Sequence, residues 1–522
     1  MKGKMLAKVY SVASFGLDSI KIEVEAEVID RGFPSFNIVG LASKAVDEAR
    51  ERVRVAINNS GLNFPSRSKI TINLAPADVV KEGSCYDLPI ALSILLASGQ
   101  LNLEKKFLEQ SLFFGELSLD GSLRHTKGVF LVADAASKNG FARIFVPRLS
   151  AAEAACFRKL DVFPVDTLSK TTAYFLGLKK IKPLAKVDLR SLISGSISEF
   201  NMSQIIGQFQ AKRALEIAAA GGHNVFMSGS PGSGKTMLAR AMPGIVPPLS
   251  SEEAIEVTRI YSATGNIDPG ESLVRKRPFR SPHHTISRVG MVGGGSKIKP
   301  GEVSLAHRGV LFLDEFGEFP RSVLEALRQP LEDGCVNISR ASGSVSFPSK
   351  FLLVAASNPC PCGYLNHPTT SCRCLPGQIA NYRKRLSGPI MDRIDIHLVV
   401  PPVKIRKLSD SLRAIDKNLS EDSVKIRERT KKARKVQRAR FKKLDLSLQS
   451  NSEMKTSQVK EICRLKTESA KLLNEAAEKL SFSARAYFKI IKISRTIADF
   501  NQEDEILPPS IAEALQYQTG RY

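Results

Sequence analysis

The sequence lacks a hydrophobic run long enough to cross a membrane. A membrane-spanning helix needs about 18 or more consecutive apolar residues, whereas the longest apolar stretch, around Leu88 to Ala97, is interrupted by Pro89 and Ser93. The first residues, Met1 to Leu6, do not open the long apolar segment that a secretory signal peptide contains. We therefore expect neither a membrane span nor a secretory signal.

Cysteine is scarce, and acidic residues are outnumbered by basic ones. The chain has eight cysteines in 522 residues, four of them in one short segment, which argues against a secreted disulfide scaffold and favours the reducing cytoplasm. It has 76 Lys and Arg residues against 52 Asp and Glu, a formal net charge of +24. This excess favours a polyanionic partner, most simply nucleic acid, with an anionic membrane surface as the alternative.

Length and hydrophobic periodicity predict about three domains, since a domain takes roughly 150 residues. Residues 1–180 are predicted to form an α/β domain, in which Lys21–Val28 alternates apolar and charged side chains as a half-buried strand does. The polar, broken segment 181–203 is the predicted linker. Residues 204–402 form a second α/β domain, and residues 403–522 are predominantly helical in pattern.

A phosphate-binding loop is the strongest motif of the chain. Residues Gly229–Thr236 fit the pattern G-x-x-x-x-G-K-[ST], between an apolar strand pattern, Val225–Met227, and a helical pattern, Met237–Met242. A glycine-rich turn that matches by chance is the alternative, and the flanking strand and helix argue against it. Lys235 would contact the β- and γ-phosphates, and Thr236 would hold Mg²⁺. The predicted ATP-binding residues are Gly229, Ser230, Pro231, Gly232, Ser233, Gly234, Lys235 and Thr236.

Two further apolar segments end in polar residues suited to ATP hydrolysis. Val310–Leu313 predicts a buried strand that ends in Asp314, placed to hold Mg²⁺ through water, and Glu315, placed to polarise the attacking water. Phe351–Ala356 predicts another strand, and Asn358 follows it. An amide at that position would sense the γ-phosphate or orient water, although Asn-Pro is also a common turn sequence.

Four cysteines form a C-x-C…C-x-C pattern with nine residues between the pairs. They are Cys360, Cys362, Cys372 and Cys374. Four thiolates on two short turns can close a tetrahedral zinc site, although the usual C-x-x-C spacing is absent. Reduced free thiols or a redox pair are the alternatives. The other cysteines are scattered, and we expect them to be buried: Cys85, Cys156, Cys335 and Cys463.

A strongly basic stretch runs from Lys404 to Lys443, with 16 Lys and Arg residues against five Asp and Glu. Ser420, Glu421 and Asp422 are typical of a helix start. Such a helix can follow a phosphate backbone, with an affinity that falls steeply with salt; a solvated helix face is the alternative. Few aromatic residues are interleaved, so base stacking is not indicated. A second candidate DNA surface comprises Arg275, Lys276, Arg277, Arg280, Lys297 and Lys299.

Several blocks of the sequence resemble the magnesium-chelatase-like AAA+ ATPases, and more narrowly the YifB/ComM type. The blocks are Ile206–Met242, Ser281–Thr285, Pro300–Glu302, Leu305–Gly309, Ser387–Arg393, Gly32–Leu41 and Ala484–Asp499. The resemblance covers essentially the whole chain. It implies an AAA+ P-loop αβα domain in the centre, a C-terminal helical lid, and an N-terminal Lon-protease-like domain of the ribosomal S5 domain 2-like fold.

The resemblance also assigns roles to residues. It makes Asn358 sensor 1, Arg485 sensor 2 and Arg393 the arginine finger that acts on the neighbouring subunit. Segments 279–301 and 336–350 would be the helix-2 insertion and the pre-sensor hairpin, which point into the central pore in related hexamers. The pair His283-His284 lies in the first segment. We interpret the pair as structural or as part of the pore loop, because no third metal ligand is spaced nearby.

The peptidase resemblance of the N-terminal domain lacks the catalytic pair. In an ungapped comparison Cys85 takes the place of the nucleophilic serine, and Phe130 takes the place of the catalytic lysine. A phenyl ring cannot accept a proton, so Ser–Lys chemistry is not available. Lys127 lies close in sequence, and a shift in register would bring it to that position. We expect this domain to be a scaffold or to bind DNA.

These features together predict an ATP-hydrolysing ring motor that acts on DNA. ATP and Mg²⁺ would be its cofactors, with zinc at the cysteine cluster, and the ring would be a homo-oligomer, expected to be a hexamer. The resemblance implies branch migration or helicase activity on single-stranded or branched DNA in recombination or natural transformation, with recombination proteins as partners and no membrane partner. The alternatives are the ATPase subunit of a metal chelatase, which drives metal insertion through a partner, and a protein-remodelling chaperone.

Overall fold

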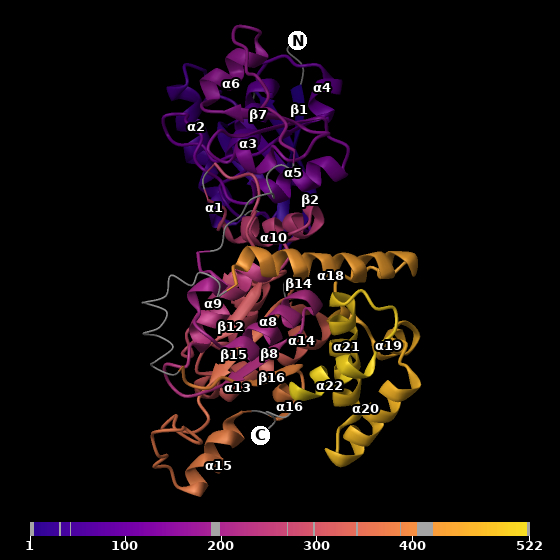
Figure 1. Cartoon of the computed structure of the whole chain (residues 1–522). Helices are drawn as coiled ribbons and strands as arrows, with labels where there is room; N and C mark the ends of the chain where they lie inside the picture. Colours follow the sequence, from indigo (N-terminus) through magenta and orange to yellow (C-terminus); the bar gives the residue numbers. More distant parts are fainter. Residues whose placement is uncertain are drawn as a thin grey trace. The chain divides into compact units, whose positions relative to one another are not determined.

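The computed structural model describes residues 5–30, 33–41, 43–188, 199–268, 270–295, 298–340, 343–386, 388–403 and 421–518. The chain divides into two compact units (Figure 1). The first comprises Met1–Ser194, Ser250–Arg275 and Ala341–Val345, and the second comprises Gly195–Leu249, Lys276–Arg340 and Ser346–Tyr522. Among the described residues, no helix combines the length and the hydropathy that a membrane span requires.

The first unit is built on a seven-stranded mixed sheet in the order β3-β4-β2-β1-β5-β6-β7. The strands are β1 (Met5–Phe15), β2 (Asp18–Ile29), β3 (Ser35–Val39), β4 (Lys69–Ala75), β5 (Ser111–Phe113), β6 (Arg143–Pro147) and β7 (Asp161–Val165). The predicted strand at Lys21–Val28 is confirmed within β2, where Ile22 and Val24 are fully buried. The helices of this part of the chain are α1 (Lys44–Asp47), α2 (Ala49–Asn59), α3 (Asp87–Ala97), α4 (Lys105–Glu109), α5 (Val129–Lys138), η1 (Ala151–Ala154) and α6 (Leu168–Phe175).

Helix α10 (Ser251–Thr264) also belongs to the first unit, although it lies inside the predicted ATPase range 204–402. The buried carboxylate of Glu153 accepts a hydrogen bond from Ser262 of this helix at 2.9 Å and one from the Phe130 N–H at 3.1 Å. Arg259 lies 3.4 Å from Asp134 on α5. The helix is therefore anchored to the N-terminal unit by buried polar contacts between residues more than a hundred positions apart.

The second unit contains a five-stranded parallel sheet in the order β16-β8-β15-β12-β9. These strands are β8 (Val225–Ser228), β9 (Phe279–Arg280), β12 (Val310–Leu313), β15 (Leu352–Ser357) and β16 (Ile396–Val399). Alternate residues enter separate cores: Val354 packs in the core that contains α8 (Phe209–Gly221) and α9 (Lys235–Ile245), and Leu353 packs in the other. A parallel sheet with both faces covered explains why its strands are almost wholly apolar.

Shorter elements complete the α/β part of this chain. They are η2 (Met202–Gln204), β10 (Gly293–Gly294), β11 (Lys299–Pro300), α11 (Arg288–Val292), α12 (Glu302–Leu305), η3 (Phe316–Glu318), α13 (Arg321–Ala326), α14 (Arg328–Asp333), β13 (Cys335–Arg340), β14 (Gly343–Pro348), α15 (Pro376–Arg385) and α16 (Gly388–Met391). The β13-β14 pair occupies the predicted hairpin segment 336–350. Parts of two predicted features, the linker residues 189–198 and the basic residues 404–420, lie outside the described residues.

The C-terminal part is helical, as the sequence pattern predicts. It comprises α18 (Ser423–Lys443), η4 (Asn451–Glu453), α19 (Thr456–Ile462), α20 (Thr467–Lys479), α21 (Ala484–Phe500) and α22 (Pro508–Gln516), drawn in orange and yellow in Figure 1. Asp422 caps α18 by accepting the Val424 N–H at 3.1 Å, which confirms the predicted helix start. Helix α18 packs against α8, α9 and α21, so these helices share one core with the sheet.

A buried ionic cluster fastens α18 to α21. Asp499 is 1% exposed, pairs with Arg440 of α18, and accepts hydrogen bonds from Arg495 at 3.1 Å and Asn451 at 2.8 Å. Arg495 is itself almost fully buried and also donates to the carbonyl of Asp504 at 2.7 Å. Removing one member of such a cluster leaves the remaining charges uncompensated inside the protein.

We expect Asp499→Ala to destabilise the C-terminal helices by about 3–5 kcal/mol, because two arginines then lose their shared carboxylate. Thermal unfolding followed by circular dichroism measures this as a lower melting temperature. The exposed Glu505 provides the control, since Glu505→Ala should leave the melting temperature almost unchanged. Equal melting temperatures for the two variants would show that the cluster contributes little.

Candidate functional site

The predicted phosphate loop lies between β8 and α9, as the motif requires. Gly232 and Gly234 have φ angles of +75° and +91°, in the left-handed region that favours glycine. At Gly229 a Cβ atom would lie 2.4 Å from the carbonyl oxygen of Val400, so a larger residue does not fit there. The hydroxyls of Ser230 and Ser233 are buried without a hydrogen-bond partner among the described residues. The loop is therefore a tight backbone cradle with unsatisfied donors, which suits a phosphate ligand.

Lys235 lies at the start of α9, and its ammonium group is turned into the loop. It donates to the carbonyls of Gly229 at 2.6 Å and Ser230 at 3.0 Å, and it lies 3.3 Å from the amide oxygen of Asn358. Burial lowers the pKa of Lys235, and the nearby Asp314 carboxylate opposes that shift. Asn358 follows β15, so the structure brings the predicted phosphate lysine and the predicted sensor together.

The predicted magnesium residues also meet. The Thr236 hydroxyl donates to the Asp314 carboxylate at 2.8 Å, although the two residues are 78 positions apart. The other Asp314 oxygen accepts the Glu315 N–H at 3.0 Å. A hydroxyl and a carboxylate at this distance, both next to a phosphate loop, provide oxygen ligands of the kind that Mg²⁺ prefers.

Glu315 has a contact that the sequence did not indicate. Its side chain is 59% exposed, and one carboxylate oxygen lies 3.3 Å from Nδ1 of His284. The rings of His283 and His284 lie against each other, with centroids 4.0 Å apart. The sequence alone favours a structural or pore-loop role for His284. The structure shows in addition that it touches the predicted general base, and no local sequence signal could have revealed that.

The two predicted arginines converge on one acid. Arg393 lies 2.6 Å and Arg485 3.0 Å from the same carboxylate oxygen of Glu332 in α14. Arg393 is 13% exposed and also donates to the Pro389 carbonyl at 2.6 Å, whereas Arg485 is 52% exposed. The arginines lower the pKa of Glu332, with Arg393 contributing most. The described side-chain contacts of Arg393 are therefore to Glu332 and Pro389, and that of Arg485 is to Glu332. None of these contacts reaches residues 229–236.

The four clustered cysteines lie in the loop between β15 and α15, and their sulfur atoms are all within 4.8 Å of one another. Cys360 is fully buried, and the others are partly exposed. Of the remaining cysteines, Cys156 and Cys463 are buried as expected. The expectation is wrong for Cys85 and Cys335, which are only partly buried.

Part of the basic stretch is structural. Arg434 is buried and donates to the carbonyls of Ala219 and Ala220 at 2.8 and 2.7 Å, where it satisfies the C-terminal end of α8. Arg429 pairs with Glu216 at 2.6 Å, and Arg440 pairs with Asp499. Arg429 is itself exposed, but it is held in ion pairs. The lysines of α18 are all exposed: Lys425, Lys431, Lys432, Lys435, Lys442 and Lys443.

In the second candidate DNA surface, too, some of the cations already have partners within the chain. Arg277 donates to backbone carbonyls, among them that of Pro248 at 3.2 Å, and Arg280 pairs with Glu302 at 2.6 Å. Lys297 lies outside the described residues. Arg275 pairs with Glu271 at 2.7 Å, so three of the predicted contact residues have partners within the chain.

The N-terminal unit contains no assembled Ser–Lys-type site among its described residues. Although Cys85 is partly exposed as a residue, desolvation of its thiol raises the pKa to about 12, so a thiolate scarcely forms there. Phe130 is fully buried, with its ring centroid 5.1 Å from that of Phe157. Lys127 packs its aliphatic chain beside Gly265.

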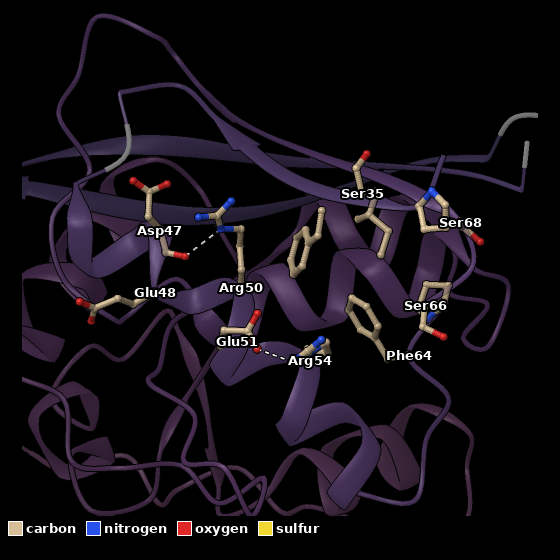
Figure 2. Close-up of a pocket in the computed structure, with 13 residues that line it drawn as sticks. Ser35, Asp47, Glu48, Arg50, Glu51, Arg54, Phe64, Ser66 and Ser68 are labelled. Atoms are coloured by element: carbon tan, nitrogen blue, oxygen red, sulfur yellow. Dashed lines mark hydrogen bonds and ion pairs between the residues drawn. The ribbon is translucent and has the colours of Figure 1, made fainter. Parts of the chain in front are cut away.

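An open pocket of about 720 Å³ lies elsewhere in this unit, between the edge strand β3 and helix α2 (Figure 2). Two arginines and three acids line it, and Arg54 pairs with Glu51 at 2.5 Å. Cys85 does not line it. The pocket carries nearly balanced charge and lacks the concentrated positive charge that a polyanion would favour.

The comparisons with known proteins agree with the geometry of the second unit. Three family models match: "Magnesium chelatase, subunit ChlI" at residues 201–408, "Subunit ChlI of Mg-chelatase" at 23–150, and "Magnesium chelatase, subunit ChlI C-terminal" at 420–518. The magnesium-chelatase 38 kDa subunit of Rhodobacter capsulatus is 27% identical over 179 residues, which cover 31% of this chain and 50% of that protein.

Longer matches extend over the whole chain. The competence protein ComM of Haemophilus influenzae is 41% identical over 514 residues, which cover 98% of this chain and 97% of that protein. The uncharacterized protein YifB of Escherichia coli is 41% identical over 518 residues, with the same coverage. The chain therefore belongs to the YifB/ComM type of magnesium-chelatase-like proteins, within a family of AAA+ ATPases.

Proposed function

We propose that the protein is an ATP-hydrolysing ring motor that acts on DNA. The observation that carries the ATPase part is the convergence of three chain segments: the Thr236–Asp314 hydrogen bond of 2.8 Å and the Lys235–Asn358 contact of 3.3 Å. Lys235 would bind the β- and γ-phosphates, and Asn358 would bind the γ-phosphate or the attacking water. The unpartnered hydroxyls of Ser230 and Ser233 fit the same ligand.

Thr236 and Asp314 would hold Mg²⁺, whose chemistry is to neutralise charge on the transferred phosphoryl group. Glu315 would accept the proton of the attacking water. Its contact with His284, 3.3 Å away, ties this base to the segment 279–301. Because that segment is the proposed pore insertion, the contact gives a physical link between what the pore binds and the position of the base.

We propose that Arg393 completes the site of a neighbouring subunit, and that the ring is a hexamer. Developing negative charge on a γ-phosphoryl group needs a cation, which is often supplied from another chain. In this chain Arg393 is held by Glu332 and has no described contact with the phosphate loop, which is compatible with a role in trans. Arg485, which pairs with the same carboxylate, would couple the nucleotide state to the helical lid.

The DNA part of the proposal rests on the exposed lysines of α18 and on the similarity to a competence protein. Lysines on one helix face can follow a phosphate backbone without reading sequence. We infer that the motor drives branch migration or strand separation during recombination, including natural transformation. A chelatase ATPase subunit is the rival, although the matching chelatase subunits cover only 31% of this chain.

Lys235→Ala and Glu315→Gln test the ATPase site. We expect Glu315→Gln to bind ATP normally and to hydrolyse it about 10²–10⁴-fold more slowly, because the general base is lost. Lys235→Ala should lose ATP binding as well. Steady-state phosphate release and nucleotide binding measure these effects, and Lys471→Ala, at an exposed lysine of α20, is the control. Normal turnover in either site variant would contradict the assignment.

Mixed rings test whether Arg393 acts in trans. Arg393→Ala and Lys235→Ala should each be inactive alone, but a mixture should regain activity, because an intact phosphate loop then meets an intact arginine from its neighbour. The ATPase rate is measured across mixing ratios. A mixture of Lys235→Ala with Thr236→Ala is the control and should stay inactive, since both defects lie in the same loop. Absence of recovery in the first mixture would place Arg393 in its own site.

Charge reversal on α18 tests the DNA surface. We expect branched or single-stranded DNA to stimulate the ATPase at about 50 mM salt and far less at about 200 mM, since phosphate contacts release counterions. The combined change Lys431→Glu, Lys432→Glu and Lys435→Glu should abolish stimulation but keep the basal rate. Reversal of Lys471 and Lys479 on α20 is the matched control. Lack of stimulation of the unaltered protein at low salt would favour the chelatase alternative.

A further inference from the structure

The loop between β15 and α15 contains the four-cysteine cluster and begins directly after Asn358. Cys360 and Cys362 lie on one turn, and Cys372 and Cys374 lie on a second turn twelve positions further on. The turns meet in space: the Cys362 N–H donates to the sulfur of Cys374 at 3.4 Å. Among the described residues, this is the one group of three or more His, Cys, Asp or Glu side chains with ligand atoms close enough to share a metal ion.

The sulfur positions fit a single metal ion. Sulfur–sulfur distances are 3.4 Å for Cys360–Cys362, 3.7 Å for Cys360–Cys372 and 3.6 Å for Cys362–Cys372. Tetrahedral ligands at a Zn–S distance of about 2.3 Å lie about 3.8 Å apart. A disulfide needs about 2.05 Å, so the sulfurs are not bonded in pairs. Ligands of a polynuclear cluster are spread over several metal atoms, which is incompatible with four sulfurs all within 4.8 Å.

The same loop touches the phosphate loop. The α-carbon of Gly363 packs so closely on Pro231 that an added Cβ would lie 2.6 Å from Cδ of the proline, and 3.8 Å from Cγ of Asn358. The turn that presents Gly363 is closed by its N–H donating to the Cys360 carbonyl at 2.9 Å. Position 363 thus lies one residue from a cysteine of the cluster and in van der Waals contact with the nucleotide site.

We propose that the four cysteines bind one zinc ion, and that this ion fixes the loop against Pro231 and so sets the shape of the nucleotide site. Most of the loop side chains from Pro361 to Leu375 are exposed or only partly buried, so hydrophobic packing does little to hold the two turns together. A metal ion that joins both turns replaces that missing core, as structural zinc does in small domains. Zinc loss frees the turn of Gly363 and, with it, the contact to Pro231. The coupling to ATP rests on the proposed function, whereas zinc binding does not.

Metal analysis of the full chain tests the zinc site. Elemental analysis of protein purified without chelator should give about one zinc per chain, the stoichiometry of a single structural site. Cys372→Ser and Cys374→Ser should lose most of that zinc. Cys335→Ser is the matched control, since Cys335 is also partly exposed but lies outside the cluster. Zinc-free protein that does not take up zinc on reconstitution, bound iron in place of zinc, or a mass loss that reports disulfides would each overturn the site.

Nucleotide binding tests the coupling separately. A fluorescent ATP analogue should bind the Cys372→Ser variant about tenfold more weakly, the scale expected for a support around a site. Gly363→Ala provides a second variant that leaves all four cysteines in place, although the left-handed φ of +82° at this position also strains an alanine. It should keep its zinc and still bind the analogue more weakly, because the new methyl group presses on Pro231. Unchanged binding in both variants would overturn the coupling and leave the zinc site. Loss of analogue binding in the zinc-loaded, unaltered protein would instead refute the proposed ATP site.

Discussion

The register of three parallel strands determines where the phosphate loop, Asp314 and Asn358 lie. Ser228 of β8 pairs with Ser357 of β15, and Leu313 of β12 pairs with Ala355. Strands β8 and β15 end at the same level, and β12 ends two residues earlier. The Gly229 N–H still donates to the Ser357 carbonyl at 3.3 Å. Ligands bind at the carboxyl edge of such sheets because the loops that follow neighbouring strands meet there. A slip of one residue in any of these strands would turn its apolar side chains to the other core and separate the polar groups.

Helix α18 joins the helical part of the chain to the sheet domain. Helix α18 is strongly basic, yet it is a structural element as much as a surface. Arg434 and Arg440 face inward to the end of α8 and to Asp499, and the exposed Arg429 pairs with Glu216. The lysines of α18 are all exposed. The division follows from chemistry, because the planar guanidinium group can satisfy several carbonyl or carboxylate oxygens at once and is more weakly hydrated than an ammonium group. The net charge of the segment therefore overstates the charge that it offers to a partner.

Local patterns predicted those features whose cause is local. The phosphate loop, the strand that ends in Asp314 and the sensor strand each follow from a short stretch of sequence, and the contacts of Thr236 with Asp314 and of Lys235 with Asn358 agree with them. What could not be predicted depends on distant pairing. Glu332 looks like any acid on an exposed helix, and its role as the shared partner of two arginines exists only in the folded chain. The same holds for α10, whose partner Glu153 lies over a hundred residues away.

The sharing of Glu332 links the two arginines in the proposed ring motor. One carboxylate cannot satisfy both guanidinium groups fully, and Arg485 and Glu332 are substantially exposed, so their pair contributes only about 0–1 kcal/mol. Arg485 can therefore leave Glu332 with little loss of free energy. Arg393 is more buried and also bonds Pro389, so its release costs more and needs a stronger competitor, such as the multiply charged phosphates of a bound nucleotide. When Arg393 leaves Glu332 for such a ligand, the carboxylate of Glu332 is no longer shared, so its ion pair with Arg485 becomes stronger. If Arg393 acts in trans, nucleotide binding in the neighbouring subunit would alter the electrostatic environment of the lid in the subunit that contributes Arg393. Sequential hydrolysis around a ring requires such a coupling between adjacent subunits.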